Sequence, residues 1–280
     1  MLQYKENRTR GTEDFPVSPY VFRYTSKVVE PHWHPEIEII YMVEGEMTAN
    51  VSEEKYVIKP GDIFFVNPEE VHMFIVQEPV VYYAIVFFPD IFRFKGVHFF
   101  EREFTNPIMG GAKRFPRLVC VSQKEYNDLQ PMIHRMFYEH MTSKPLLFSD
   151  LTTLFCVMLE QNLLQDTRET QDYQHSDAVK VCIKYMEENY ARKITLSEIA
   201  ELVHMSSNYF CQYFKRHTGI TPFKQLHLIR VREATAALQE TEDSVVTIAE
   251  ACGFENVSFF IRKFKELTGE TPSAYRKRLR

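Results

Sequence analysis

Short apolar runs separated by turn residues fill the chain from about residue 20 to residue 105. The runs are rich in β-branched and aromatic side chains, which favour strands over helices. Turn signals break the pattern at Glu44-Gly45, Pro60-Gly61-Asp62 and Asn67-Pro68. Several short strands at regular spacing are typical of a sandwich or a small barrel. We therefore expect residues 1–121 to form an N-terminal domain built around a β-barrel.

The hydrophobic period becomes helical in residues 122–165. The longest helix predicted there carries an apolar stripe at 4-3-4 spacing, made of Leu147, Leu151, Leu154 and Met158. Such a stripe packs either on the chain's own barrel or on a second copy in a homodimer, and the pattern alone does not separate the two. Residues 166–176 are polar and aperiodic, so we interpret them as a linker.

Residues 177–280 are predicted to be helical throughout, and they contain the same short sequence motif twice. The stretches Ser207–Pro222 and Val257–Pro272 share seven residues at equivalent positions. Each copy ends in a helix stop at Gly219 or Gly269, followed by a Thr-Pro pair that starts another helix. A long helix joins the copies. These helix start and stop signals predict two helix-turn-helix units, which read neighbouring segments of one long ligand such as duplex DNA.

The outer faces of the two repeated helices carry different polar groups. Steps of 100° per residue from Phe210 bury the aromatic positions and turn Asn and Gln side chains outward, while the second copy turns Ser and Arg outward. These are the groups that read base edges, and lysine suits phosphates. The candidate DNA contacts are Ser207, Asn208, Cys211, Gln212, Lys215, Arg216, Asn256, Ser258, Arg262 and Lys265. For a single helix we would favour a merely solvated face, but two copies favour DNA reading.

Charge is distributed unevenly between the two parts of the chain. The net charge is −5, yet Ser176–Arg280 contains 16 Lys and Arg against 13 Asp and Glu, and the remainder contains 17 against 25. The two parts therefore have opposite signs, as expected if only the C-terminal part contacts phosphate. This distribution favours double-stranded DNA as the partner of the C-terminal part.

Residues from about 177 to 280 resemble the DNA-binding domain of the AraC/XylS family of bacterial transcription regulators. The resemblance rests on ITLSEIAELVHMSSNYFCQYFKRHTGITPFKQLHLIRVREA and on TIAEACGFENVSFFIRKFKELTGETPSAYRKR. It implies seven helices, with the second helix of each unit in a major groove, and it allows RNA polymerase as a further partner. One position departs from the pattern. His204 stands where the second unit has Gly253, and histidine tolerates a left-handed backbone better than most residues.

The predicted barrel contains residues with the chemistry of metal ligands. His32, His34 and Glu38 have the same parity along one predicted strand, and His72 follows on a later strand. The spacing from His32 to Gly45 resembles the first cupin motif. The region around His72 resembles the second cupin motif, with a glutamate in place of its usual glycine. The N-terminal domain is thus similar to the cupin-type sensor barrel common in this family.

Three interpretations of these four residues remain open. In the first interpretation they hold a divalent metal such as Zn²⁺, Ni²⁺, Mn²⁺ or Fe²⁺, as in enzymatic cupins. Alternatively they line a pocket for a small polar effector such as a sugar, as the family resemblance implies, with Tyr24 and Tyr83 as stacking surfaces. In the third interpretation they only form hydrogen bonds within the barrel.

Composition narrows the class of protein further. The chain is 45% hydrophobic and 25% charged, and no apolar run approaches the ~20 residues of a membrane span. The N-terminus lacks the apolar stretch of a signal peptide, so we expect a cytoplasmic protein without membrane contact. The five scattered cysteines argue against a disulfide framework and against a cysteine zinc site.

The sequence therefore predicts an α+β multidomain protein. It combines a cupin-like β-barrel and a helical dimerisation segment with an all-α domain of two helix-turn-helix units. We interpret the chain as an effector-responsive, sequence-specific transcription regulator of sugar or carbohydrate genes, and not as an enzyme. The alternative is a metal-binding cupin enzyme or metal sensor tethered to DNA.

Overall fold

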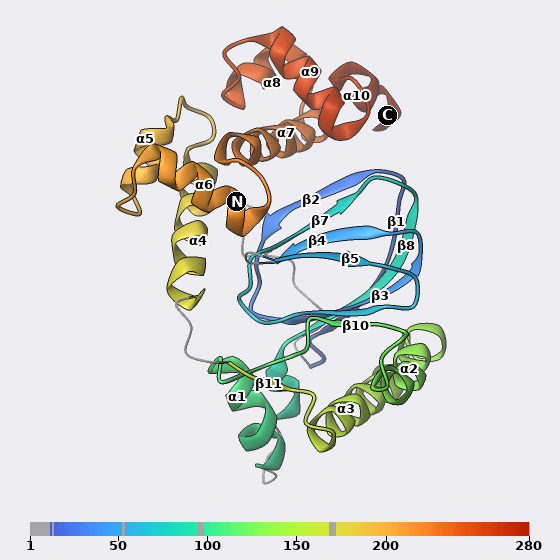
Figure 1. The fold of residues 1–280 in the computed structure, drawn as a ribbon. Coiled ribbons are helices and arrows are strands. Elements are labelled where there is room, and N and C mark those ends of the chain that lie inside the picture. The colour runs from blue at the N-terminus through green and yellow to red at the C-terminus, as the bar shows by residue number, and fades with distance from the viewer. Residues whose placement is uncertain (1–11, 13, 52–53, 94–97, 168–171, 280) are drawn as a thin grey trace.

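The computed structural model describes residues 12, 14–51, 54–93, 98–167 and 172–279. Two β-sheets face each other in the N-terminal part, and the C-terminal helices lie beside one of them (Figure 1). The strands are β1 (Val17–Tyr24), β2 (Lys27–His32), β3 (Ile37–Glu44), β4 (Met47–Val51), β5 (Glu54–Ile58), β6 (Ile63–Val66), β7 (His72–Val76), β8 (Val80–Phe87) and β10 (Leu118–Val119). One sheet has the order β1-β8-β3-β6-β10 and the other β2-β7-β4-β5. The predicted cupin-like barrel is confirmed.

Successive side chains of a strand point to opposite faces of its sheet, and apolar side chains are buried on both faces. In β3, Ile40 and Met42 point between the sheets, whereas Ile39 points out of the barrel into a second apolar core. In β7, Phe74 points inward, and Met73 points outward. Because both faces are covered, the strands read as continuous apolar runs and not as a clean alternation.

Helices cover the outer face of the five-stranded sheet. They are η1 (Pro89–Phe92), η2 (Glu101–Thr105), α1 (Asn106–Met109), α2 (Tyr126–His134), η3 (Arg135–Glu139) and α3 (Lys144–Glu160). The short strands β9 (Lys113–Arg114) and β11 (Gln165–Asp166) pair with each other. The predicted helical segment contains α2, η3 and α3, and further helical turns lie in a stretch assigned to the barrel from sequence.

The apolar stripe of α3 faces the chain's own barrel. Leu147, Leu151, Leu154 and Met158 are at most 1% exposed, in one core with side chains of the outer sheet face such as Phe87. Of the two interpretations given to this stripe, packing on the barrel is therefore the one observed. The stripe is not available as a dimer contact, because its side chains are already covered within the monomer.

The described C-terminal residues form seven helices, the number implied by the family resemblance. They are α4 (Asp172–Asn189), α5 (Leu196–Glu201), α6 (Ser207–Thr218), α7 (Pro222–Glu240), α8 (Val245–Ala251), α9 (Val257–Thr268) and α10 (Pro272–Leu279). Phe210 and Phe214 lie in the core of the first unit, and Phe260 and Phe264 lie in the core of the second. The repeated phenylalanines are thus residues that pack the two units.

The helices begin and end at the capping residues and glycines expected from the sequence. Thr195 and Glu198 form the expected capping box at the start of α5. Gly219 and Gly269 end α6 and α9 in the left-handed conformation, with φ of 79° and 83°. His204 also has a positive φ, of 54°, as expected from its place in the turn of the first unit.

The region predicted as a linker is shorter in the structure. α4 begins at Asp172, inside the predicted interval 166–176, and β11 extends to Asp166. Residues 168–171 lie outside the described residues. Across the parts that are described, each helix is too short or too polar to span a lipid bilayer.

Candidate ligand pocket and nucleic-acid interface

Three histidines come together between the two sheets. His32 ends β2 and is paired with His72 at the start of β7, and an irregularity of register after Val29 shifts the alternation of β2. One ring nitrogen from each of His32, His34 and His72 lies within 4.8 Å of the others. The sequence placed His32, His34 and Glu38 on one strand. In the structure His34 lies in the connection after β2, and Glu38 belongs to β3.

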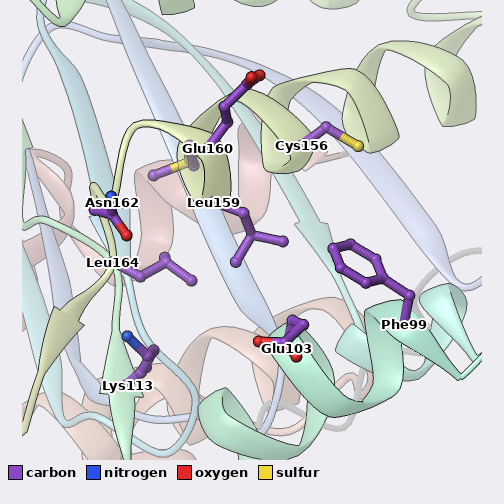
Figure 2. Close-up of a pocket in the computed structure, with 9 residues that line it drawn as sticks. Phe99, Glu103, Lys113, Cys156, Leu159, Glu160, Asn162 and Leu164 are labelled. Atoms are coloured by element: carbon purple, nitrogen blue, oxygen red, sulfur yellow. The ribbon is translucent and has the colours of Figure 1, made fainter.

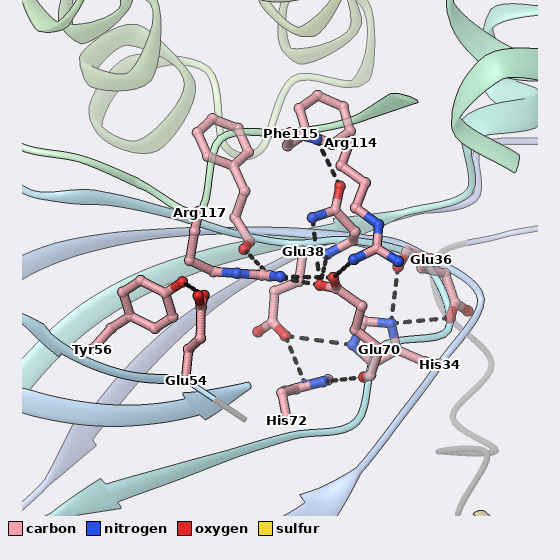
Figure 3. A network of polar contacts seen from close by, with 12 residues as sticks. His34, Glu36, Glu38, Glu54, Tyr56, Glu70, His72, Arg114, Phe115 and Arg117 are labelled. Carbon is pink, nitrogen blue, oxygen red and sulfur yellow. Dashed lines mark hydrogen bonds and ion pairs between the residues drawn. The ribbon is translucent and has the colours of Figure 1, made fainter. Parts of the chain in front are cut away.

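The carboxylate of Glu38 lies between two of these rings (Figure 3). Its Oε2 atom is 3.4 Å from Nε2 of His34 and 3.5 Å from Nε2 of His72. Burial alone raises the pKa of the Glu38 carboxyl. The hydrogen bond with His34 and the interaction with the nearby His72 outweigh burial and hold this pKa well below its usual range. The site therefore combines a carboxylate with imidazoles in a buried space.

Each histidine is held by its Nδ1 atom. The Nδ1 atoms of His32, His34 and His72 lie 2.8, 3.1 and 2.9 Å from the backbone carbonyls of Glu30, Glu36 and Glu70, respectively. A carbonyl only accepts, so each Nδ1 carries the proton and donates it. The Nε2 atom of a neutral ring is then left with a lone pair, and Nε2 of His72 is buried without a hydrogen-bond partner among the described residues.

This arrangement fits a metal ion. Metal-binding histidines commonly donate their second ring nitrogen to a backbone carbonyl, which fixes the tautomer and the ring orientation. Three imidazoles and one carboxylate are a sound donor set for a divalent transition metal. Burial, together with the neighbouring His72 and His34, holds the pKa of His32 well below its usual range. The neutral form, which is the form that binds metal, is therefore favoured at His32.

A second polar network anchors the loop before His72. Both carboxylate oxygens of Glu70 accept from Arg117, at 2.6 and 2.5 Å, and Arg114 lies 3.5 Å away (Figure 3). Asn67 donates its backbone N–H to Glu70, at 2.9 Å. Burial raises the pKa of Glu70, but the charge of Arg117 outweighs it and lowers the pKa. Glu70, which replaces the usual cupin glycine, thus fixes the carbonyl that orients His72.

The aromatic residues on the inner faces of the sheets, where the histidines lie, differ in part from those expected. Tyr24 lies beside Tyr82 on the inner face, with ring centroids 6.3 Å apart. Tyr83 was predicted to line the pocket, but it lies on the outer face, where it stacks on Phe137 with centroids 5.3 Å apart. The prediction for Tyr83 is therefore wrong, because successive strand residues face opposite sides. Tyr82 takes its place.

The candidate DNA contacts lie on the outer faces of α6 and α9. Seven of them are exposed on these helices, namely Asn208, Gln212, Lys215, Arg216, Ser258, Arg262 and Lys265. Ser207 and Cys211 are half-buried. Asn256 is exposed but caps α9, with its Oδ1 accepting from the backbone N–H of Phe259 at 2.9 Å. Its side-chain oxygen is thus already engaged. The matching cap of α6 is Ser206, which is not among the contacts predicted from sequence.

A surface cavity of about 430 Å³ lies away from both groups of residues, between η2 and α3 (Figure 2). Its lining is partly apolar, with Phe99, Leu159 and Leu164, and partly charged, with Glu103, Lys113 and Glu160. None of the residues predicted from sequence to bind a ligand lines this cavity.

Comparison with known proteins identifies both parts of the chain. Residues 15–137 match the family described as AraC-like ligand binding domain, and residues 199–278 match a helix-turn-helix domain family. An uncharacterized HTH-type transcriptional regulator of Bacillus subtilis, YdeC, is 24% identical over 98% of this chain and 96% of its own length. The HTH-type transcriptional activator RhaS of Pectobacterium carotovorum is 24% identical over 88% and 86%.

A further relative is named for a sugar operon. The raffinose operon transcriptional regulatory protein RafR of Pediococcus pentosaceus is 25% identical over 85% of this chain and 84% of its own length. These relatives are transcription regulators and not enzymes, as expected from the sequence. The ligand-binding and helix-turn-helix parts occur here in one chain. The chain therefore belongs to the AraC family of DNA-binding, effector-responsive transcription regulators.

Proposed function

We propose that this protein regulates carbohydrate genes by binding a sugar-type effector between its two sheets and promoter DNA through α6 and α9. The observation that carries the DNA part is the pair of repeated helices. Their buried faces are alike, and their exposed faces carry different polar side chains. Two units with different outer faces read two different base sequences.

Each recognition helix is assigned base-reading and phosphate-binding residues. Asn208 and Gln212 on α6 suit adenine, and Arg262 on α9 suits guanine. Lys215 and Lys265 near the ends of the two helices suit phosphates. The guanidinium of Arg262 lies 5.4 Å from the ring centroid of Phe259, which supports the side chain from one side.

The pocket suits a small polar effector. Sugar-binding sites combine flat aromatic surfaces for C–H groups with charged or amide groups for hydroxyls. Tyr24 and Tyr82 offer the aromatic surface, and Glu38 and His72 offer the polar groups. The relative named for a raffinose operon supports a sugar over other polar ligands.

A divalent metal ion is the second candidate for the pocket, and the Nδ1 anchors of the three histidines favour it. His32, His34, His72 and Glu38 would hold the ion. A bound cation would also give a sugar hydroxyl a Lewis-acidic partner, so the two candidates are compatible in one pocket.

Further parts of the assignment remain proposals. We propose the boundaries 1–121, 122–165, 166–176 and 177–280 as functional segments, although α4 begins within the third. We propose a homodimer whose contact lies outside the buried α3 stripe, contact with RNA polymerase at the promoter, and a cytoplasmic site of action.

The proposed function is tested by selection of duplexes from a random-sequence pool with full-length protein, together with a thermal-shift screen of sugars. We expect one preferred sequence with two patches of protection about one helical turn apart. We also expect a rise in melting temperature with at least one sugar, which Tyr82→Ala reduces more than Tyr83→Ala. Enrichment of no sequence would reject the proposal of sequence-specific binding.

A further inference from the structure

The DNA-binding helices dock on the outer face of the four-stranded sheet (Figure 1). The contact uses β4, outward-pointing residues of β2 and β7, Trp33 directly after β2, and the loop that precedes β7. We call Glu30, Trp33, Glu69, Val71 and Met73 the docking face. These residues form apolar contacts and ion pairs with α4, α6 and α7, or with the segments that join these helices.

Apolar side chains form the centre of the contact. Val71 is only 3% exposed, because it belongs to the core of the first helix-turn-helix unit with Val179 and Phe210. Met73 is fully buried in a small cluster with Ile220 and Leu228, and Leu267 of α9 packs against this cluster. The barrel therefore touches both helix-turn-helix units and the long helix between them.

Ion pairs flank the apolar centre. Nζ of Lys180 lies 2.8 Å from a carboxylate oxygen of Glu69 and 5.7 Å from the ring centroid of Trp33. Nη1 of Arg232 lies 3.3 Å from a carboxylate oxygen of Glu30. In both pairs the barrel supplies the acid and the DNA-binding domain supplies the base. Arg232 also pairs with Glu187 and Glu233 of its own domain, so Lys180 is the cation whose charge depends more on docking.

The docking face is the reverse side of the histidine pocket. Trp33 lies between His32 and His34 in the sequence, and Val71 and Met73 flank His72. Backbone hydrogen bonds add to this sequence proximity. Glu69 donates its N–H to the carbonyl of His34 at 2.8 Å while its side chain holds Lys180.

Glu30 has a similar double role. Its carbonyl accepts from Nδ1 of His32 at 2.8 Å, and its side chain pairs with Arg232. Any ligand that changes the positions of the histidines therefore acts on residues that hold the DNA-binding domain.

We propose that docking on this face restrains DNA binding, and that the pocket controls the restraint through β2, β7 and the loop before β7. The inference rests on the proposed function. The restraint follows from charge and from geometry. The part of the chain before Ser176 carries 17 basic and 25 acidic residues, so a docked barrel repels phosphates. Docking also fixes the two units relative to one another before DNA is met.

Tryptophan fluorescence tests the docking directly, because Trp33 is the single tryptophan of the chain. Full-length protein is titrated with a labelled random-sequence duplex at low salt, and DNA binding is followed by anisotropy of the label. We expect the emission of Trp33 to move to longer wavelength as DNA binds. Binding without a change at Trp33 overturns the inference and leaves the proposed function intact. Absence of DNA binding counts against the proposed function itself.

Charge reversal at the docking face measures the restraint. Glu69→Lys places two cations opposite each other. We expect the affinity of this variant for DNA to be about five-fold higher than that of the control variant Glu46→Lys. The control adds the same charge to the barrel at a site where Glu46 is 60% exposed and pairs with Lys59 of the barrel. The double variant Glu69→Lys/Lys180→Glu restores an opposite-charge pair with no change in net charge, so it should return to the affinity of the wild-type protein. Equal affinities for the two single variants, or weaker binding by Glu69→Lys, contradict the restraint.

Hydrogen exchange tests the link to the pocket without a known ligand. Coupling between two sites is reciprocal, so DNA must act on the pocket if the pocket acts on DNA binding. We expect exchange in residues 32–34 and 69–73 to rise when the duplex binds, and exchange in β5, on the far edge of the same sheet, to stay the same. Unchanged exchange in the pocket segments would show that docking is independent of the pocket.

Discussion

Nε2 of His72 lies 3.5 Å from a carboxylate oxygen of Glu38, and within the part of the chain that the structure describes this buried nitrogen has no hydrogen-bond partner. Nδ1 of the same ring donates to the carbonyl of Glu70, so the ring can face Glu38 only with a lone pair or with a second proton. A lone pair opposite a carboxylate is repulsive, and burial strengthens the repulsion. A proton or a metal ion between the two atoms removes this repulsion.

The first prediction concerns a metal ion at this place. Full-length protein freed of metal with a chelator should bind about one Zn²⁺ per chain, because three imidazoles and a carboxylate complete a tetrahedral set. His72→Ala should lower the affinity at least about ten-fold, as loss of a ligand removes one of four bonds. Titration calorimetry and metal analysis measure both. His98→Ala is the matched control, since His98 is 77% exposed at its side chain and lies outside the cluster. Equal Zn²⁺ binding by the two variants would rule out the cluster as a metal site.

The second prediction concerns pH and the C-terminal domain. His227 packs against Phe254 and Phe259, and burial, followed by the charges of Arg230 and Lys263, lowers its pKa to about 4. The unfolded chain, with a histidine pKa of about 6.5, binds the proton more readily, so stability falls as pH drops from about 6.5 towards 4.

Urea unfolding at about pH 7 and about pH 5 measures this effect. We expect His227 to account for a loss of about 1 kcal/mol over this interval, after allowance for its partial solvation. His227→Gln should remove that part of the pH dependence, whereas the exposed His98→Gln should retain it. An identical pH dependence in the two variants would contradict the role of His227.

The third prediction compares the two turns of the helix-turn-helix units. His204 has φ of 54°, and Gly253 has φ of 79° at the equivalent position. His204→Gly should stabilise the first unit by up to about 1 kcal/mol, because glycine adopts this backbone without strain. Gly253→Ala should destabilise the second unit by more than about 2 kcal/mol, since the added Cβ would lie 2.3 Å from the carbonyl oxygen of Tyr190. Thermal unfolding decides the matter, and a stabilising Gly253→Ala would refute the reasoning.

The fourth prediction separates phosphate contacts from base contacts. Lys215→Ala should weaken binding to all duplexes alike and lower the slope of log affinity against log salt by about 1. Lys184→Ala removes the same charge from α4, where Lys184 is 69% exposed and pairs with Glu188, and should leave the slope almost unchanged. Affinities measured over a salt series provide the test. A similar slope for both variants would place Lys215 away from the phosphates.

The helical domain could be predicted closely because its signals are local. Caps, stop glycines and a repeat of seven residues act within a few positions of one another, and each has a specific residue requirement. The turn at His204 could be predicted in the same way, by comparison of the first unit with the second.

The barrel could be predicted less completely because both faces of its sheets are buried. Tyr82 and Tyr83 are neighbours on β8, and nothing in a run of apolar residues says which of them faces the pocket. The role of Glu70 depends on Arg117, which lies far along the chain. A local sequence motif cannot reveal a partner that is so distant in the sequence. The α3 stripe was ambiguous for a similar reason, since its period is the same on a barrel and in a dimer.

The central claim is that α6 and α9 read different bases in successive major grooves. Its most direct test is the affinity of wild-type protein, Gln212→Ala and Arg262→Ala for a selected operator and for each of its single-base variants. We expect each substitution to cost about 1–3 kcal/mol and to relax discrimination at its own position, with the two positions about ten base pairs apart. Unchanged discrimination in both variants, or relaxation at the same base pair, would contradict the claim.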